Sequence, residues 1–313
     1  NPAYPDYAPE LPPIPIGKLG QKLAKGFNAK GYHWWPSDVS ILSQDHDGRQ
    51  KCVNAGTCDL GCAAGAKGGT NFTYWPMLEN AGVELRSECR VREILVDEAT
   101  GFATGVLYHG ADGQVHEQMA ELVVVACNGV GTPRLLLNSK SKAFPDGLAN
   151  RNGMVGKNLM FHPLTGVTGV FGEPMLGHEG PMACSILSQE FYETDSTRDF
   201  VRGYGLHSGR STTPMTFALG GYGIDSPIPW GAEHRETMDN VYPYLAGLTV
   251  VSEDLPEEQN CVTLDPDMTD SDGIPAPKIT YRLGENTRKM LRHGEERAKE
   301  ILLAAGAKKV LSK

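Results

Sequence analysis

Three cysteines within eleven residues form the densest group of reactive side chains in the sequence. Five residues separate Cys52 from Cys58, and three separate Cys58 from Cys62. Thiolates spaced this closely can bind a metal ion or an iron–sulfur cluster, and Gly56 and Gly61 allow the backbone to bend around it. Neither gap is that of a redox C-x-x-C motif, and no Cys/His pair follows at zinc-finger spacing. The segment therefore predicts cluster or metal ligands.

A second candidate site follows the apolar run 122–126, which is continuous and rich in β-branched residues. Such a run is typical of a parallel strand that is buried on both faces. Cys127 begins the turn and is expected to be a buried thiol. Thr132 then predicts a helix N-cap, and Pro133 predicts the first helical residue. A strand, a glycine-containing turn and a helix N-terminus together form the geometry by which dinucleotide folds bind anionic groups.

Hydrophobic periodicity predicts the elements that position these segments. Helices are expected at 19–29, 70–81 and 285–305, and Gly306 is expected to end the last one. Strands are expected at 83–85, 91–97, 103–109, 114–119, 245–251 and 261–264. The Asp112–Gly113 pair predicts a hairpin turn. After residue 153 the strands no longer alternate with helices, which indicates an antiparallel second domain.

Composition limits the kinds of protein that the chain can be. Its 313 residues, 40% hydrophobic and 21% charged, are typical of a globular protein with two domains, or one large domain and an embedded second one. A net charge of −9 argues against nucleic-acid binding. The sequence contains no run of 18 apolar residues, so no transmembrane helix is predicted. Seven irregularly spaced cysteines predict a reducing, cytoplasmic location. Because the chain starts with Asn1, we expect a processed or partial sequence whose leader, if it has one, lies upstream.

Several stretches, in order, resemble the glucose–methanol–choline (GMC) oxidoreductases, flavoenzymes that oxidise an alcohol to a carbonyl. Each motif is weak alone, and their joint order is a strong signal. Within the family, the chain is most similar to the branch of FAD-dependent glucose, gluconate, sorbitol and fructose dehydrogenases. The matching stretches are 52–67, 84–94, 124–137, 144–150, 154–163, 260–266 and 273–281.

The resemblance implies an α/β chain, α+β overall, with an incomplete dinucleotide fold. Residues 1–154 would be part of the FAD-binding domain, and residues 155–313 part of an antiparallel-sheet substrate domain. Residues 1–50 contain no G-x-G-x-x-G flavin motif, and the chain stops at Lys313, before the family's segment with the catalytic histidine. The sequence therefore looks like the middle of a flavoenzyme. No catalytic residue is assigned, and we expect the isolated chain to lack turnover.

The resemblance also implies site residues. The backbone of Val91 would contact the adenine of FAD, and the turn after residue 125 would approach the flavin. The cysteines match the three thiolates that ligate a three-iron cluster in the sugar-dehydrogenase branch, although a structural role or simple burial is the alternative. The expected cofactor contacts are Val91, Ala126, Cys127, Asn128, Gly129 and Asn158, and the expected cluster ligands are Cys52, Cys58 and Cys62.

The activity that the resemblance implies is FAD-dependent dehydrogenation of an alcohol, such as a sugar or polyol. The absent histidine would take the hydroxyl proton while hydride passes to the flavin. A cluster would pass electrons to an acceptor subunit, and without a cluster a soluble acceptor or dioxygen would serve, as in the family's alcohol oxidases. The rival interpretation is a non-enzymatic acidic binding or scaffold protein whose cysteines hold a structural metal.

Overall fold

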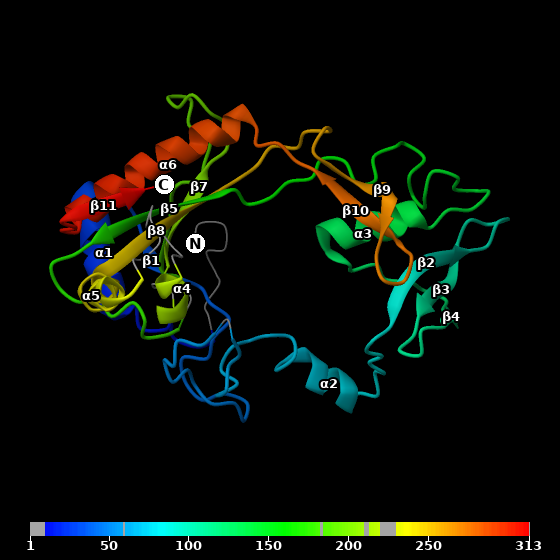
Figure 1. Ribbon diagram of the computed structural model, residues 1–313, viewed down its shortest axis with the longest axis horizontal. Coiled ribbons are helices and arrows are strands. Elements are labelled where there is room, and N and C mark those ends of the chain that lie inside the picture. The colour runs from blue at the N-terminus through cyan, green and yellow to red at the C-terminus, as the bar shows by residue number, and fades with distance from the viewer. Residues whose placement is uncertain (1–9, 59, 182–183, 210–212, 220–229, 313) are drawn as a thin grey trace. The chain divides into compact units, whose positions relative to one another are not determined.

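The computed structural model describes residues 10–58, 60–181, 184–209, 213–219 and 230–312, drawn in colour in Figure 1. The chain forms two compact units that are interleaved along the sequence. Unit 1 comprises Asn1–Gly82, His162–Glu253 and Glu285–Lys313, and unit 2 comprises Val83–Phe161 and Asp254–Gly284. The chain therefore passes between the units four times. Residues 1–154 and residues 155–313 each contribute to both units.

Unit 1 is built on an antiparallel sheet of six strands in the order β1-β6-β7-β8-β5-β11. Helices α1 (Gly17–Lys30) and α6 (Glu285–Ala304) pack against each other and against this sheet (Figure 1). The strands are β1 (Trp35–Pro36), β5 (Leu164–Val170), β6 (Cys184–Phe191), β7 (Tyr204–Gly209), β8 (Leu245–Ser252) and β11 (Lys309–Ser312). Shorter helices are α2 (Tyr74–Asn80), α4 (Pro214–Ala218), α5 (Ala232–Asn240) and the 3-10 helix η1 (Tyr242–Tyr244).

The main hydrophobic core lies between this sheet and the two long helices. Leu23 and Phe27 of α1 and Ile301 and Leu302 of α6 are completely buried in it. Their spacing places them on one face of each helix, which is why amphipathic segments here fold against a sheet. The helix predicted at 285–305 is confirmed. Gly306, with φ of +94°, ends it in the left-handed conformation that glycine adopts readily.

Unit 2 contains the hairpin sheet β2 (Arg90–Val96), β3 (Ala103–His109) and β4 (Val115–Met119). A second hairpin joins β9 (Cys261–Thr269) to β10 (Pro275–Thr280), and helix α3 (Asn128–Asn138) packs against β2, β9 and β10. The predicted Asp112–Gly113 turn is confirmed, since it joins β3 to β4 and Gly113 has φ of +74°. The combination of helices with antiparallel sheets confirms the α+β class. Within the described residues, no helix has the length and apolar character that spanning a bilayer requires.

The prediction of a fully buried strand at 122–126 is wrong for this structure. The segment belongs to none of the described sheets, and Leu122 and Val124 are each 78% exposed. A β-branched run becomes a buried strand only where neighbouring strands pair with it and side chains cover both faces. No such neighbours occur among the described residues. Residues 83–85, also predicted as a strand, have no β-pairing either.

Two predicted helix starts also need correction. Helix α3 begins at Asn128, so Thr132 and Pro133 lie within it rather than at its start. The reason is that the Asn128 side chain accepts hydrogen bonds from two N–H groups of the first turn, as described below. Helix α2 begins at Tyr74 instead of at residue 70, which places Pro76 in its first turn, where the missing N–H has no helical partner to lose.

We predict that Gly26→Ala destabilises unit 1. A Cβ at this position would overlap the carbonyl oxygen of Ile301 and lie 2.9 Å from the Ala305 Cβ, where α1 meets α6. Better helix propensity would contribute about 1 kcal/mol, but overpacking costs about 1–3 kcal/mol. Because the overlapped atom belongs to the backbone, we expect an overpacking cost in the upper part of that range, about 2–3 kcal/mol, and therefore a net fall of about 1–2 kcal/mol in the free energy of unfolding, measured by urea titration. Lys25→Ala, on the exposed face of α1, is the control, and equal or greater stability of Gly26→Ala would contradict the close crossing.

Candidate functional site

A small recess in unit 2 brings together two of the predicted cofactor contacts. Its volume is about 140 Å³, and both Val91 of β2 and Cys127, next to the start of α3, line it. Ligand pockets usually measure about 300–1,000 Å³, so this recess alone is too small to enclose a cofactor. The other residues that line it are Arg92, Gly131, Arg134, Leu135, Asn138 and Ile274.

The N-terminus of α3 faces this recess and is held by its own side chains. Asn128 has φ of +59°, a left-handed conformation that asparagine tolerates better than most residues. Its Oδ1 accepts hydrogen bonds from the N–H groups of Val130, at 2.9 Å, and Gly131, at 3.1 Å. The Cys127 N–H donates to the Thr132 Oγ1 at 3.2 Å. The turn is therefore preorganised without any ligand.

Two backbone donors are left over at this helix start. Among the described residues, the N–H groups of Asn128 and Gly129 have no hydrogen-bond partner. A Cβ added to Gly129 would meet no atom within 4 Å, so the space in front of the turn is open. Free N–H groups and the positive end of the helix dipole favour an anionic group such as a phosphate. Cys127, predicted to be buried, is exposed because the preceding segment is not covered by other strands.

Asn128 and Gly129 do not line the recess, and neither do the two predicted cofactor contacts not yet placed, Ala126 and Asn158. Ala126 is exposed at the end of the extended segment, adjacent in sequence to Cys127. Asn158 is half-buried, with φ of +58°, in a stretch that runs along β9. There the Val262 N–H donates to the Gly156 carbonyl at 2.7 Å, and the Leu159 N–H donates to the Asn260 carbonyl at 2.8 Å. The structure thus brings Val91 and Cys127 together but does not place Asn158 beside them.

An arginine–carboxylate network, which was not predicted from the sequence, fixes the back of the recess. Arg134 of α3 donates through its Nη2 to Asp270 Oδ2 at 2.8 Å and to the Ile274 carbonyl at 3.0 Å. Its Nε donates to the Pro275 carbonyl at 2.7 Å. Arg90 of β2 reaches the same Asp270 oxygen at 3.2 Å. One carboxylate therefore joins α3, β2 and the turn between β9 and β10.

The electrostatics of Asp270 show how strongly the network favours its charged form. Burial raises the pKa of this carboxyl, but hydrogen bonds outweigh that effect. They come from Arg134, from the backbone N–H groups of Ile274 and Asp272, and from Arg90, and they bring the pKa down to about 2. The Asp-rich turn is visible in the sequence, but no residue near Asp270 in the sequence identifies Arg134 as its partner.

The cysteine segment belongs to unit 1, where one arginine holds it in place. The Arg49 guanidinium donates to the Gly65 carbonyl at 2.7 and 3.1 Å and to the Lys67 carbonyl at 3.1 Å. In addition, the Leu42 N–H donates to the Ala66 carbonyl at 3.0 Å. The loop that follows the third cysteine is therefore attached to the stretch that precedes the first one.

The three thiols are half-buried and are not gathered into one group. Cys52 Sγ accepts the Asn54 N–H at 3.4 Å, and Cys62 Sγ accepts the Lys67 N–H at 3.5 Å. The Lys67 N–H holds the pKa of the Cys62 thiol below its ordinary value. Across the described residues, no set of three His, Cys, Asp or Glu side chains is placed to hold a metal ion. The described residues therefore contain no preformed cluster site.

Comparison with known proteins identifies the family that this chain resembles in sequence. Residues 18–164 match the model of a family described as GMC oxidoreductase. The chain is similar to 2-methyl-1,2-propanediol dehydrogenase of Mycolicibacterium austroafricanum, with 39% identity over 98% of this chain and 56% of that protein. It is also similar to the fructose dehydrogenase large subunit of Gluconobacter japonicus, with 28% identity over 95% of this chain and 53% of that protein.

Among solved structures, the chain is similar to a crystal structure of formate oxidase, with a TM-score of 0.58 and 17% identity. That alignment covers 97% of this chain and 59% of the other. At this identity the likeness concerns the fold alone. The chain spans about half the length of the curated relatives it matches.

We predict that Asp270→Asn lowers the free energy of unfolding of unit 2 by about 2 kcal/mol at pH 7, because two arginines lose a charged acceptor. The folded-state pKa lies below the unfolded value, so this contribution is present above about pH 4 and disappears as the pH falls through about 2. In denaturant titrations, the difference in free energy of unfolding between wild type and Asp270→Asn should therefore be smaller at pH 2.5 than at pH 7. Asp267→Asn, at an exposed position of β9, is the control. A stability difference between wild type and Asp270→Asn that does not change with pH would contradict the network.

Proposed function

The chain belongs to the GMC oxidoreductase family, and on that basis we propose that the whole protein is an FAD-dependent oxidoreductase acting on the CH–OH group of an alcohol. The observation that carries the proposal is the recess that joins β2 to the start of α3. It unites Val91 and Cys127, both within the matched residues 18–164, beside unpaired backbone donors. The other interpretation, a non-enzymatic scaffold with a structural metal, does not account for the family match.

Several features support FAD as the group that would bind here. The backbone of β2 at Val91 would lie beside the adenine, and residues Ala126 to Gly129 would approach the flavin with small side chains and open space. The free N–H groups at the start of α3 would bind an anionic part of the nucleotide. Asn158 is retained as a weaker candidate contact. When bound, FAD supplies the acceptor for a hydride, and the chain's own residues orient it and exclude water.

We propose an alcohol substrate of the sugar or polyol class. The relatives include a diol dehydrogenase, a fructose dehydrogenase and the paromamine 6'-oxidase of Streptomyces fradiae, so polyhydroxylated substrates recur among them. Both dehydrogenases and an oxidase occur in this set. We propose a dehydrogenase that passes electrons to an acceptor subunit or a soluble acceptor, with dioxygen as the alternative acceptor. The cytoplasmic location remains a prediction.

We predict that Val91→Trp in the full-length protein reduces flavin occupancy, because a bulky side chain would fill the recess. Overfilling a close-fitting site costs about 1–3 kcal/mol, or about fivefold to a hundredfold in affinity. Flavin absorbance per protein, and its bleaching by an added alcohol under nitrogen, measure occupancy and activity separately. Val115→Trp, on the exposed strand β4 of the same sheet, is the matched control.

Two outcomes would count against the proposed function. Full flavin occupancy of Val91→Trp would show that the recess is not part of the cofactor site. Failure of every sugar, polyol and simple alcohol to bleach the wild-type flavin would refute the CH–OH activity. Reduction of an artificial dye without oxygen consumption distinguishes a dehydrogenase from an oxidase.

The iron–sulfur cluster is a separate hypothesis, supported by the spacing of Cys52, Cys58 and Cys62 and not by their positions in the structure. If it is correct, the anaerobically purified full-length protein contains iron and acid-labile sulfide. Cys58→Ser removes one of three thiolates, so we expect it to lower the iron and sulfide contents by roughly twofold or more. Cys261→Ser, far from this segment in sequence, should leave both unchanged. Wild-type protein without iron and sulfide would rule the cluster out.

A further inference from the structure

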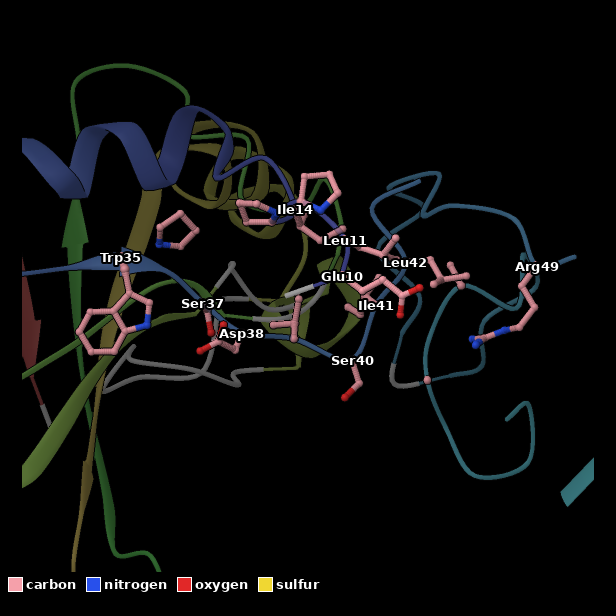
Figure 2. Close-up of a pocket in the computed structure, with 16 residues that line it drawn as sticks. Glu10, Leu11, Ile14, Trp35, Ser37, Asp38, Ser40, Ile41, Leu42 and Arg49 are labelled. Atoms are coloured by element: carbon pink, nitrogen blue, oxygen red, sulfur yellow. The ribbon is translucent and has the colours of Figure 1, made fainter. Parts of the chain in front are cut away.

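Unit 1 contains a larger cavity that the proposed flavin site does not use. Its volume is about 490 Å³, within the range of about 300–1,000 Å³ that is usual for small-molecule sites. In Figure 2, Trp35, Ser37 and Asp38 lie toward one end, and Arg49 lies at the other. Most of the lining is apolar and includes Leu11, Ile14, Val39, Ile41 and Leu42.

The cavity is preformed, because each of its walls is tied to a fixed element. Trp35 and Pro36 form β1, which pairs with Leu187 and Ile186 of β6. The Ser37 N–H then donates to the Ser185 carbonyl at 3.2 Å. A ligand entering here would therefore need to order little of the chain.

The two other walls are held in the same way. The Ser43 Oγ donates to the Pro12 carbonyl at 2.5 Å, which fixes the stretch 10–14. The Gly68 N–H donates to the Ser40 carbonyl at 2.6 Å, which fixes the stretch 39–42. The cavity thus does not depend on a single flexible loop.

Four of the polar side chains that line the cavity are free to bind a ligand. In the part of the chain that the structure describes, the Trp35 indole N–H, the Ser37 and Ser40 hydroxyls and the Asp38 carboxylate make no hydrogen bond. Arg49 differs, since its guanidinium already donates to the Gly65 and Lys67 carbonyls. Glu10, the second carboxylate of the lining, lies 3.7 Å from the His46 Nε2. The cavity therefore offers an aromatic face, two hydroxyls and two carboxylates, but no uncommitted cation among the described residues that line it.

We propose that this cavity is a binding site for a neutral polyhydroxylated molecule, a sugar or a polyol. The C–H face of such a molecule packs on an indole ring, while its hydroxyls pair with carboxylate and hydroxyl groups. Asp38 and the absence of a free cation disfavour an acidic sugar. The choice of occupant rests on the proposed function, because an alcohol-oxidising protein of this class handles polyols.

The test measures the binding of D-fructose and D-sorbitol to the purified full chain. Binding is monitored by indole fluorescence and by ligand-observed NMR. We expect saturable binding that Trp35→Ala weakens about fivefold to tenfold and Asp38→Asn weakens about threefold to fivefold. D-gluconate should bind more weakly than D-sorbitol. Trp230→Ala is the matched control, because Trp230 belongs to unit 1, is 92% exposed and does not line the cavity. Thermal unfolding checks that each variant is folded.

The proposal would be overturned if wild type showed no saturable polyol binding. It would also be overturned if Trp35→Ala and Trp230→Ala lost equal amounts of polyol affinity. If Trp35→Ala fails to fold, unchanged polyol affinity of Asp38→Asn would overturn it alone. Flavin bleaching by alcohols in the full-length protein tests the proposed function independently. Bleaching without binding to this cavity refutes only the cavity assignment, and binding without bleaching refutes only the oxidoreductase.

Discussion

The contact on which unit 2 depends is the hydrogen bonding of one guanidinium group. Arg134 binds the turn between β9 and β10 through a carboxylate and two carbonyl oxygens, and Asp270 extends the same contact to Arg90 of β2. These bonds keep α3 against both hairpins. The position of the helix start, with Cys127 and Asn128, follows from them, and so does the recess beside Val91.

Local patterns predicted much of the fold. The predicted strands 103–109 and 114–119, which flank Asp112–Gly113, form a hairpin whose strand pairing and turn chemistry lie within one short stretch. The same holds for the helix that ends at Gly306, where amphipathic spacing and a left-handed glycine agree. In these cases every interaction that determines the structure is close in sequence.

The features that were missed depend on distant partners. The pattern in 122–126 specifies a strand only when other strands cover it, and Leu122 shows the result when none does. Arg134 and Asp270 are 136 residues apart, so neither predicts the other. Cysteine spacing likewise cannot report where the thiols point. Val91 and Cys127 could be named together because a family resemblance carries long-range information that residue patterns lack.

The interleaved connectivity has a consequence for genetic dissection of this protein. Because the chain passes between the units four times, no single cut yields either unit intact. A gene truncated after residue 154 would encode α3 without β9 and β10, leaving Arg134 with no turn to bind. Isolating unit 2 would require joining 83–161 to 254–284 through a short linker that replaces the excised stretch.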